Sequence, residues 1–425
     1  MTKIFLENSK FQLDQNIGFN HDVKKIDYIE ISPNVASSSM INSSGDVVFS
    51  LQQSSNPIDI CNSFIYFKIK ISDLDKTKVD LTLENDFFPR MFERMQLTIG
   101  NTIVENFNHV GEMSSILNFV MNDYSFKQND GELSGWIPDD EKGDTEDKGF
   151  KKRQEFYSSG SGSGSAEATF EGIFPLKLLF GFLQDYNRIL YLIKIELIMN
   201  RKIDNKEIFF GKAKANGADA DLKAKCEFTE LKWFIPEITL NPILQTRLLD
   251  RLRSTKPILV NYLKRITSKI SVQPGTIYTF SPGLVSSRPK YIFVGFKKKD
   301  KSYKINNSLF IQKDGNEKLT SLIVELNSTN YPRNPIQFDY DKNFEMRPYL
   351  QYKLMCLNYG NEPQLSYQDF KNLYSIFCFD VSDQDVNDVI NGMKVNIIME
   401  KTDGFQPDMI VVILLESMLE IELSG

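Results

Sequence analysis

The chain has 425 residues, of which 41% are hydrophobic and 25% are charged, as is usual for a folded protein. Because a typical domain has roughly 100–200 residues, this length predicts two domains. The formal net charge is −6 and no run of five basic residues occurs, so the sequence predicts no concentrated basic surface for binding nucleic acid.

The first part of the chain contains short apolar runs separated by turn residues, a pattern typical of strands. The clearest alternation of apolar and polar residues, with a period of two, lies in Ser63–Ile71. Glu112–Met121 has apolar residues at helical spacing and predicts an amphipathic helix. The predicted strands of this part are Lys25–Ser32, Val47–Gln52, Ser63–Ile71, Met95–Ile99 and Thr102–Phe107, and the last two form a predicted hairpin around Gly100-Asn101.

Residues 127–168 interrupt this pattern. They contain an acidic cluster, then a basic one, and then the Gly/Ser tract Ser158–Ser165. Few apolar residues are present, so we expect a mobile, exposed loop. The regular tract is compatible with a natural loop and with an engineered linker. Apolar residues return at Ile173–Phe182 and at Ile189–Met199, which we expect to be a long buried strand.

The second part repeats the pattern of the first after a polar linker at 201–225. Asn241–Ser254 is predicted to be a helix, with Asn241 as its N-cap and Pro242 in its first turn. Phe370–Phe377 is predicted to be a helical turn. The predicted strands are Glu227–Phe234, Ile258–Leu263, Lys269–Val272, Thr276–Phe280, Tyr291–Phe296, Ser308–Gln312, Leu319–Leu326, Lys394–Glu400 and Met409–Glu422.

About eight short strands in each half, with turns between them, indicate an all-β fold with a few short helices. Strands and helices do not alternate as a parallel sheet would require. We therefore expect two tandem antiparallel jelly-roll barrels, the first at 1–200 and the second at 226–425.

The cysteines Cys61, Cys226, Cys356 and Cys378 lie far apart, and no signal peptide is evident at the N-terminus. We expect reduced, mostly buried thiols and synthesis in a reducing compartment. The longest apolar run, Met409–Leu415, is much shorter than the ~20 residues of a transmembrane helix, so it predicts a buried strand and no transmembrane segment.

Candidate catalytic residues are scarce. The chain has two histidines, His21 and His109. His109 and Glu112 are spaced as a possible ligand pair, but no further ligands complete a zinc site, and a histidine at a helix start is the better interpretation. A nucleophile elbow is absent, and Gly160–Gly164 does not match a phosphate-binding loop. Lys297–Lys301 is the densest basic run, and we interpret it as a solvated loop after a strand.

The acidic cluster Asp139–Asp147 has two candidate functions, as a carboxylate pair of the glycosidase type or as a loop that binds calcium. The apolar surroundings that raise the pKa of a catalytic acid, and the ligand spacing of an EF-hand, are both missing from this stretch. A solvated charge run is the better interpretation. The sequence therefore predicts no enzyme, and no catalytic, cofactor-binding or metal-binding residues.

Five segments resemble those of double jelly-roll major capsid proteins of the Polinton (Maverick) and adintovirus type, which are distantly similar to adenovirus hexon. The resemblance covers most of Ile173–Leu423 and, more loosely, Lys25–Met121. The five segments, which occur in the family's order, are Ile173–Met199, Glu230–Asn241 (ELKWFIPEITLN), Ser281–Phe296 (SPGLVSSRPKYIFVGF), Ile323–Phe338 and Tyr374–Gln384 (YSIFCFDVSDQ).

The resemblance implies a structural protein of the virion capsid. Three chains would form a pseudo-hexameric capsomer, and the capsomers would build an icosahedral shell, with a minor (penton) capsid protein as a further partner. Assembly would take place inside the host cell, in the cytoplasm or the nucleus. The acidic balance of the chain implies that the double-stranded DNA genome is enclosed without a dedicated basic binding site.

Three other interpretations remain open at this stage. The first is a β-sandwich module that binds a receptor or a carbohydrate. The second is a hydrolase built on a sandwich, which requires a pocket with convergent carboxylates or a metal. The third is a domesticated, endogenous copy of a capsid gene with a host role.

Overall fold

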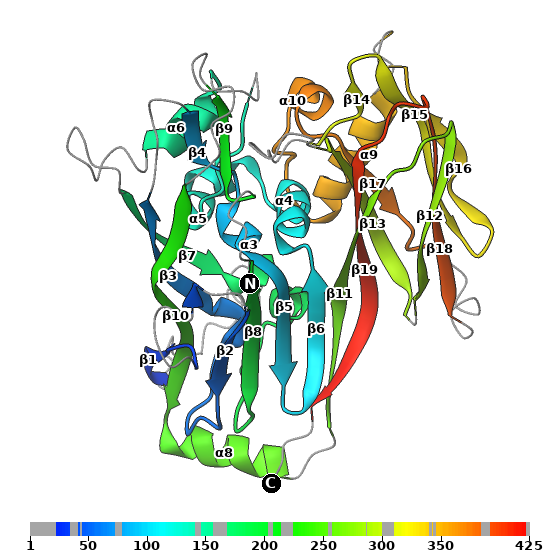
Figure 1. Cartoon of the computed structure of the whole chain (residues 1–425). Coiled ribbons are helices and arrows are strands. Elements are labelled where there is room, and N and C mark those ends of the chain that lie inside the picture. The colour runs from blue at the N-terminus through cyan, green and yellow to red at the C-terminus, as the bar shows by residue number, and fades with distance from the viewer. Residues whose placement is uncertain are drawn as a thin grey trace, which may run out of the picture.

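The structure is a computed structural model in which two β-barrels stand side by side (Figure 1). It describes residues 23–34, 41–42, 45–72, 79–140, 146–155, 168–202, 207–213, 224–253, 257–285, 287–299, 310–339, 342, 346–383 and 392–421. His21, the tract Ser158–Ser165 and the first two residues of the predicted strand Ser308–Gln312 lie outside these residues, and the rest of that predicted strand forms only an isolated bridge from Phe310 to Tyr374.

The first barrel consists of two four-stranded sheets, here called 1A and 1B. Sheet 1A has the order β1 (Val23–Ile31), β10 (Lys225–Leu240), β3 (Phe64–Ser72), β7 (Ala168–Pro175). Sheet 1B has the order β2 (Gly45–Leu51), β8 (Ile195–Arg201), β5 (Phe92–Ile99), β6 (Thr102–Asn108). Above them lies a separate two-stranded sheet, β4 (Val79–Leu83) and β9 (Phe209–Ala213).

The second barrel has the corresponding sheets 2A and 2B. Sheet 2A has the order β11 (Ile258–Ser271), β19 (Asp408–Ile421), β13 (Pro289–Lys297), β17 (Ile376–Asp380). Sheet 2B contains β12 (Ile277–Val285), β18 (Met393–Lys401) and β15 (Glu317–Leu326), and β15 also pairs with β16 (Thr329–Gln337) and β14 (Lys313–Asp314).

Both barrels have the same strand order. If the strands of each barrel are numbered along the chain, leaving out β4, β9 and β14, sheets 1A and 2A both read 1-8-3-6, and sheets 1B and 2B both read 2-7-4-5. All pairings between these strands are antiparallel. Two antiparallel sheets connected in this way form a jelly roll. The predicted fold class, two tandem jelly rolls, is confirmed.

The helices lie mostly at the upper end of the barrels, and α8 lies beneath the first barrel where the chain crosses to the second (Figure 1). The predicted helices are confirmed at α4 (Val110–Met121) and α8 (Pro242–Arg253), and Asn241 Oδ1 accepts the Ile243 N–H at 3.2 Å. The other α-helices are α3 (Phe87–Arg90), α5 (Asp130–Ser134), α6 (Lys148–Glu155), α7 (Gly181–Asp185), α9 (Met346–Asn358) and α10 (Tyr367–Asn372), and the 3₁₀ turns are η1 (Ile60–Asn62), η2 (Tyr124–Gln128) and η3 (Leu176–Leu178).

Helix α9 was not predicted from the sequence. Its apolar residues occupy two faces, because Tyr352 and Met355 are buried whereas Leu350 and Leu354 are exposed. A helix that is apolar on two sides lacks the single stripe by which an amphipathic helix is detected. The predicted helical turn Phe370–Phe377 is in fact the end of α10 followed by strand β17.

Three strand predictions were wrong in extent. Ile258–Leu263 and Lys269–Val272 belong to one strand, β11, because the polar residues between them lie at the edge of sheet 2A and contact the first barrel there. Ile189–Met199 is not one long strand: β8 begins at Ile195, after a turn in which Leu192 has a φ of 55°.

The strand pairing does not follow the predicted domain boundary at 225/226. β10 pairs with β1 and β3 along most of its length, and β9 pairs with β4, although both strands lie beyond residue 200. Eight strands are needed to close the first jelly roll, and β10 is the eighth. We therefore propose that the first domain extends to Leu240 and that α8 is the connection to the second.

Sheet 2A is buried on both faces. In β19, Met409, Val411 and Ile413 point into the core of the second barrel, whereas Ile410 and Val412 join the hydrophobic cluster of the first. β13 alternates in the same way, with Ile292 on the inner side and Phe293 facing the first barrel. A strand buried on both faces is continuously apolar. This explains the run Met409–Leu415, which was predicted correctly as a buried strand.

We expect two adjacent truncations in β13 to be similarly damaging. Ile292→Ala should lower the free energy of unfolding by about 2–5 kcal/mol and Phe293→Ala by about 3–5 kcal/mol, since both side chains are fully buried but in different clusters. Chemical denaturation measures both. Ile277→Ala, at an exposed position, is the control and should change it by less than about 0.5 kcal/mol. A harmless Phe293→Ala would show that sheet 2A does not pack on the first barrel.

Candidate functional site: the inter-barrel junction

Several of the polar groups that the fold buries lie where the two barrels meet, a region here called the inter-barrel junction. The first barrel contributes β6, α4 and α7, and the second contributes β11 and β19. β6 and β11 run beside each other in the middle of the molecule (Figure 1). The junction is therefore built from an edge strand of each barrel and from two helices of the first.

Carboxylates of the first barrel cap the free edge of β11. β11 is the edge strand of sheet 2A, so every second N–H points away from its partner β19. The N–H of Leu263 donates to Asp185 Oδ2 at 2.8 Å, and that of Arg265 donates to Glu105 Oε1 at 2.9 Å. In addition, the Tyr262 hydroxyl donates to the Val104 carbonyl at 2.9 Å. These bonds satisfy the edge and fix its register against the first barrel.

The side chain of Arg265 reaches back into the first barrel. Its guanidinium donates to the Leu178 carbonyl at 2.7 Å and to Gln184 Oε1 at 2.5 Å. Glu105, which binds the Arg265 backbone, also accepts the Phe182 N–H at 2.9 Å. Complete burial raises the pKa of Glu105 to about 7, although the nearby Arg265 opposes this shift.

Gly181 allows α7 to approach β11. A Cβ atom at this position would lie 1.9 Å from the Leu263 carbonyl oxygen, which belongs to the backbone and cannot rotate away. Only glycine permits this distance. The Phe-Gly-Phe sequence Phe180–Phe182 is thus explained by contact between the two barrels.

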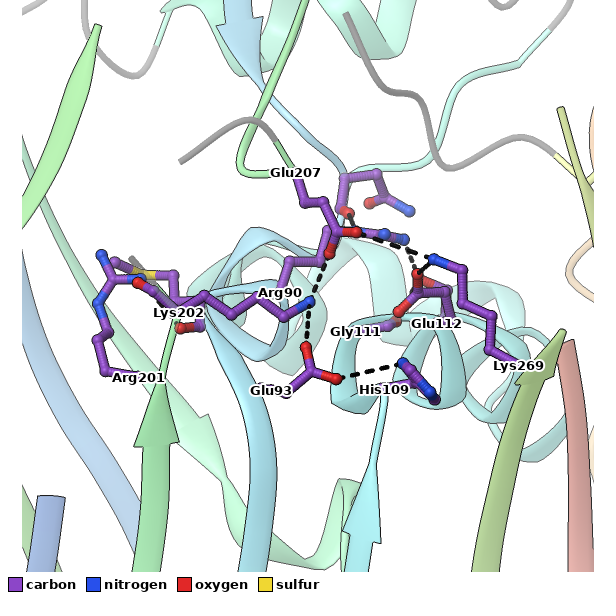
Figure 2. Close-up of polar contacts among 12 residues, drawn as sticks. Arg90, Glu93, His109, Gly111, Glu112, Arg201, Lys202, Glu207 and Lys269 are labelled. Atoms are coloured by element: carbon purple, nitrogen blue, oxygen red, sulfur yellow. Dashed lines mark hydrogen bonds and ion pairs between the residues drawn. The ribbon is translucent and has the colours of Figure 1, made fainter. Parts of the chain in front are cut away.

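A group of buried charges lies at the upper end of the junction, and Figure 2 shows its contacts. Glu112 of α4 is 1% exposed, and its Oε1 lies 2.9 Å from Lys269 Nζ of β11. Glu207 Oε1 lies 3.9 Å from the same ammonium group and also pairs with Lys202. Lys297, at the end of β13, is 4% exposed and lies close enough to interact electrostatically. We call these five residues the charge cluster.

The cations control the charge of Glu112. Burial alone would raise the pKa of its carboxyl group, but Lys269, Lys297 and Lys202 outweigh burial and hold this pKa well below its usual range. Burial, reinforced by Arg90, lowers the pKa of Lys297 to about 8. Glu112 therefore stays ionised and serves as the counter-charge for buried cations of both barrels.

A third set of contacts joins the segments that follow the fifth strand of each barrel. Tyr352 of α9 donates to the Phe119 carbonyl at 2.8 Å, and Gln364 donates to the Asn118 carbonyl at 2.7 Å and accepts from the Trp136 indole at 3.3 Å. The Tyr374 hydroxyl accepts the Asp139 N–H at 2.9 Å. The first barrel's insertion is thus anchored on the second.

The prediction that 127–168 is an exposed loop was wrong for several of its described residues. Trp136, Asp139, Phe150 and Arg153 are buried, and Arg153 Nη2 lies 2.8 Å from Asp139 Oδ1. Asp147 is also buried and accepts the N–H groups of residues 140 and 149 at 3.1 and 2.8 Å. Asp139 and Asp147 are therefore not part of a solvated charge run, because they bind an arginine and backbone donors, whereas Glu146 of the same cluster is exposed.

Burial also raises the pKa of Asp139 to about 7, against the opposing charge of Arg153. The buried surroundings that raise the pKa of a carboxyl group, which the sequence did not indicate, are therefore present at Asp139. However, the partner of Asp139 is a cation rather than the second carboxylate, across a substrate cleft, that a glycosidase requires.

The histidine prediction is confirmed: His109 directly precedes α4, with a φ of 52°. His109 and Glu112 do not face a common metal site. The Nδ1 atom of His109 lies 3.4 Å from Glu93 Oε1, whereas Glu112 faces Lys269. No group of three or more metal-binding side chains is found within the described residues. The four cysteines are free and buried, as expected.

The interpretation of Lys297–Lys301 as a solvated loop was wrong for its first residue. Lys297 is the last residue of β13 and points into the charge cluster, whereas Lys298 is exposed and pairs with Asp314 at 2.8 Å.

The residues that form the junction were not identified as site residues from the sequence. The available signal was a charged residue inside an apolar strand, such as Glu105 between Val104 and Phe107. A buried charge of this kind must find a partner. Nothing in one sequence says that the partner belongs to another domain.

The junction also contains a cavity of about 870 Å³, lined by Asp185, Tyr262, Arg288, Lys290 and Glu416 among others. Asp185, one of its two acidic residues, is already engaged as the cap of Leu263. Within the part of the chain that the structure describes, no helix has the length and apolar character needed to cross a membrane. The chemistry of the junction is that of attachment between two domains.

Two barrels of identical strand order, joined edge to edge, define the class of double jelly-roll proteins. The family model described as "Double jelly roll-like domain" matches residues 159–406, and the chain belongs to this family. No protein among the curated sequences matches the chain.

Solved structures of similar fold come from viruses. A chain of the Sputnik virophage structure has a TM-score of 0.66 at 12% identity, with 98% of this chain and 91% of that chain covered. The Faustovirus major capsid protein has a TM-score of 0.55 at 9% identity, with 98% and 94% covered. The mavirus major capsid protein has a TM-score of 0.50 at 10% identity, with 98% and 93% covered. At these identities the likeness concerns the fold.

Removing the central anion of the charge cluster should be more harmful than removing one cation. Glu112→Gln leaves Lys269 and Lys297 buried without their counter-charge and should cost about 3–5 kcal/mol of stability. Lys269→Met should cost less, since Glu112 keeps its other cations. Denaturant titration measures the free energy of unfolding of both variants. Lys298→Met, which removes an exposed ion pair, is the control and should change this free energy little. The reverse order would contradict this account of the cluster.

Stability should also depend on pH through Glu105. Its pKa in the folded protein is raised to about 7 from an ordinary value of 4.5, so the folded state binds the extra proton and stability falls as pH rises from about 4.5 to 7. Glu105→Gln removes this titration. The melting temperature of the variant relative to the wild type should therefore increase over this window. A pH-independent difference between the two proteins would contradict the assignment.

Proposed function

We propose that this chain is a major capsid protein, three copies of which form a pseudo-hexameric capsomer. The observation that supports this most directly is the fusion of two barrels with the same strand order into one body. Three such chains around a threefold axis present six similar barrels. A ring of this kind needs heterologous contacts, in which two different surfaces of each chain meet.

Capsomers of this shape would then tile an icosahedral shell around double-stranded DNA, with a minor (penton) capsid protein at the fivefold positions. The acidic balance of 56 Asp and Glu against 50 Lys and Arg supports enclosure of the genome without condensation by this protein. The location would be the virion capsid, after assembly inside the host cell. The five segments that resemble capsid proteins of the Polinton and adintovirus type favour this type within the family.

The test is the mass of the purified full chain in solution. Light scattering after size-exclusion chromatography should give three times the chain mass of 49.0 kDa, and negative-stain images should show hexagonal outlines. Because obligate interfaces are largely apolar, the trimer should persist at high salt. A protein that remains monomeric at every concentration at which it stays soluble would overturn the proposal.

A further inference from the structure

Sheet 1A has an exposed aromatic face. Its inner side chains, such as Ile65 and Phe67, fill the first barrel, but Tyr28, Phe64 and Phe234 point outward. The rings of Phe64 and Phe234 are stacked with centroids 5.3 Å apart, and Tyr28 lies edge-on to Phe64 at 5.6 Å. Tyr66 packs edge-on against Phe234 and extends the group. Ile26, two residues before Tyr28 on β1, is 62% exposed. We call these five residues the aromatic face. Contiguous exposed apolar groups mark interaction sites.

Helix α9 has an exposed apolar stripe on the second barrel. Met346, Leu350, Leu354 and Leu357 recur at spacings of four, four and three, so they lie on one side of the helix. Their exposed fractions are 69, 53, 51 and 43%. The opposite side of α9 packs on β17 of its own barrel and on α4 of the first, and its buried residues are Tyr352, Met355 and Cys356. We call the four exposed residues the α9 stripe.

The junction within the chain shows how two such surfaces fit together. Sheet 2A corresponds to sheet 1A in strand order, and its outer face joins the hydrophobic cluster of the first barrel, while α9 covers its edge strand β17. The contact of the first barrel includes α4, the helix that follows the fifth strand: a Cβ at Gly295 of β13 would lie 3.4 Å from Ile116 of α4. The helix in the corresponding place in the second barrel is α9. Within the chain, the helix that follows the fifth strand of the first barrel packs on the outer face of sheet 2A. The helix that follows the fifth strand of the second barrel, α9, and the outer face of sheet 1A could form the same kind of contact between two chains.

We infer that the α9 stripe of one chain packs on the aromatic face of a second copy of the same chain. This rests on the proposed trimer and identifies its contact surfaces. Because the two surfaces belong to different barrels, the contact is heterologous, and repetition around a threefold axis closes the ring. Helix α9 also contains Arg347 and Lys353 but no acidic residue, and aromatic rings accept cations as well as apolar groups.

The first experiment compares the oligomeric state of three full-length proteins. Leu350→Glu/Leu354→Glu should raise the concentration for half-trimerisation by at least about tenfold relative to the wild type, since charge is placed in a desolvated contact. Ile243→Glu, a matched change at a 64% exposed position on α8, should leave it unchanged. Circular dichroism confirms that each variant is folded. An equal loss in I243E would overturn the assignment, because added charge alone would then explain it.

The second experiment tests the pairing of the surfaces. Ile26→Glu/Tyr28→Glu alters the aromatic face and should also give monomers, and its charge has the same sign as that of the α9 variant, so the two altered surfaces repel each other. When mixed, the α9 variant supplies an intact aromatic face and the other variant an intact α9 stripe, so heterodimers should form without closing into trimers. Absence of heterodimers would overturn the assignment.

The outcomes separate the two proposals. A wild-type protein that is monomeric contradicts the proposed function itself. A wild-type trimer that both pairs of substitutions leave intact contradicts only the choice of surfaces and leaves the capsid proposal in place.

Discussion

The two-sided burial of sheet 2A is the constraint on which the rest of the molecule depends. One face of this sheet closes the second barrel, and the other belongs to the hydrophobic cluster of the first, so neither barrel has its full core without it. Consecutive residues of a single strand, such as Val411 and Val412, pack into the cores of different domains. A sheet held in this way cannot rotate relative to the first barrel without exposing apolar surface to water. The two jelly rolls therefore behave as one body rather than as two beads on a linker.

Polar groups give this apolar contact its register. Apolar packing alone tolerates sliding, whereas the bonds from Leu263 and Arg265 of β11 to Asp185 and Glu105 are satisfied in only one position of the strand. The same bonds hide an edge strand that would otherwise be free to pair with another sheet. Burying ions such as Glu112 has an electrostatic cost, and a buried ion pair is weak evidence for stability. Its contribution here is specificity: a misdocked barrel would leave several charges without partners.

A rigid pair of barrels is what a threefold assembly needs in order to resemble a sixfold one. Were the barrels free to move, three chains would give a flexible ring with no defined outline. The internal junction and the proposed contact between chains would use equivalent elements, a helix after the fifth strand on one side and the outer face of the 1-8-3-6 sheet on the other. Repetition of one docking geometry, once within the chain and once between chains, explains why the two jelly rolls share their strand order.

The fold class, helices α4 and α8 and most strands followed from the sequence, because local periodicity and turn residues reflect which face of an element is buried. The apolar run Met409–Leu415 was correctly predicted to be a buried strand. Other features depended on tertiary contacts between residues far apart in the chain. β10 completes the first barrel although it follows the predicted linker, Asp139 is buried because Arg153 folds back onto it, and Lys297 lies in a charge cluster rather than in solvent. Hydrophobic periodicity is a property of neighbouring residues, whereas the partner of a buried charge and the barrel to which an edge strand belongs are decided only when distant segments meet.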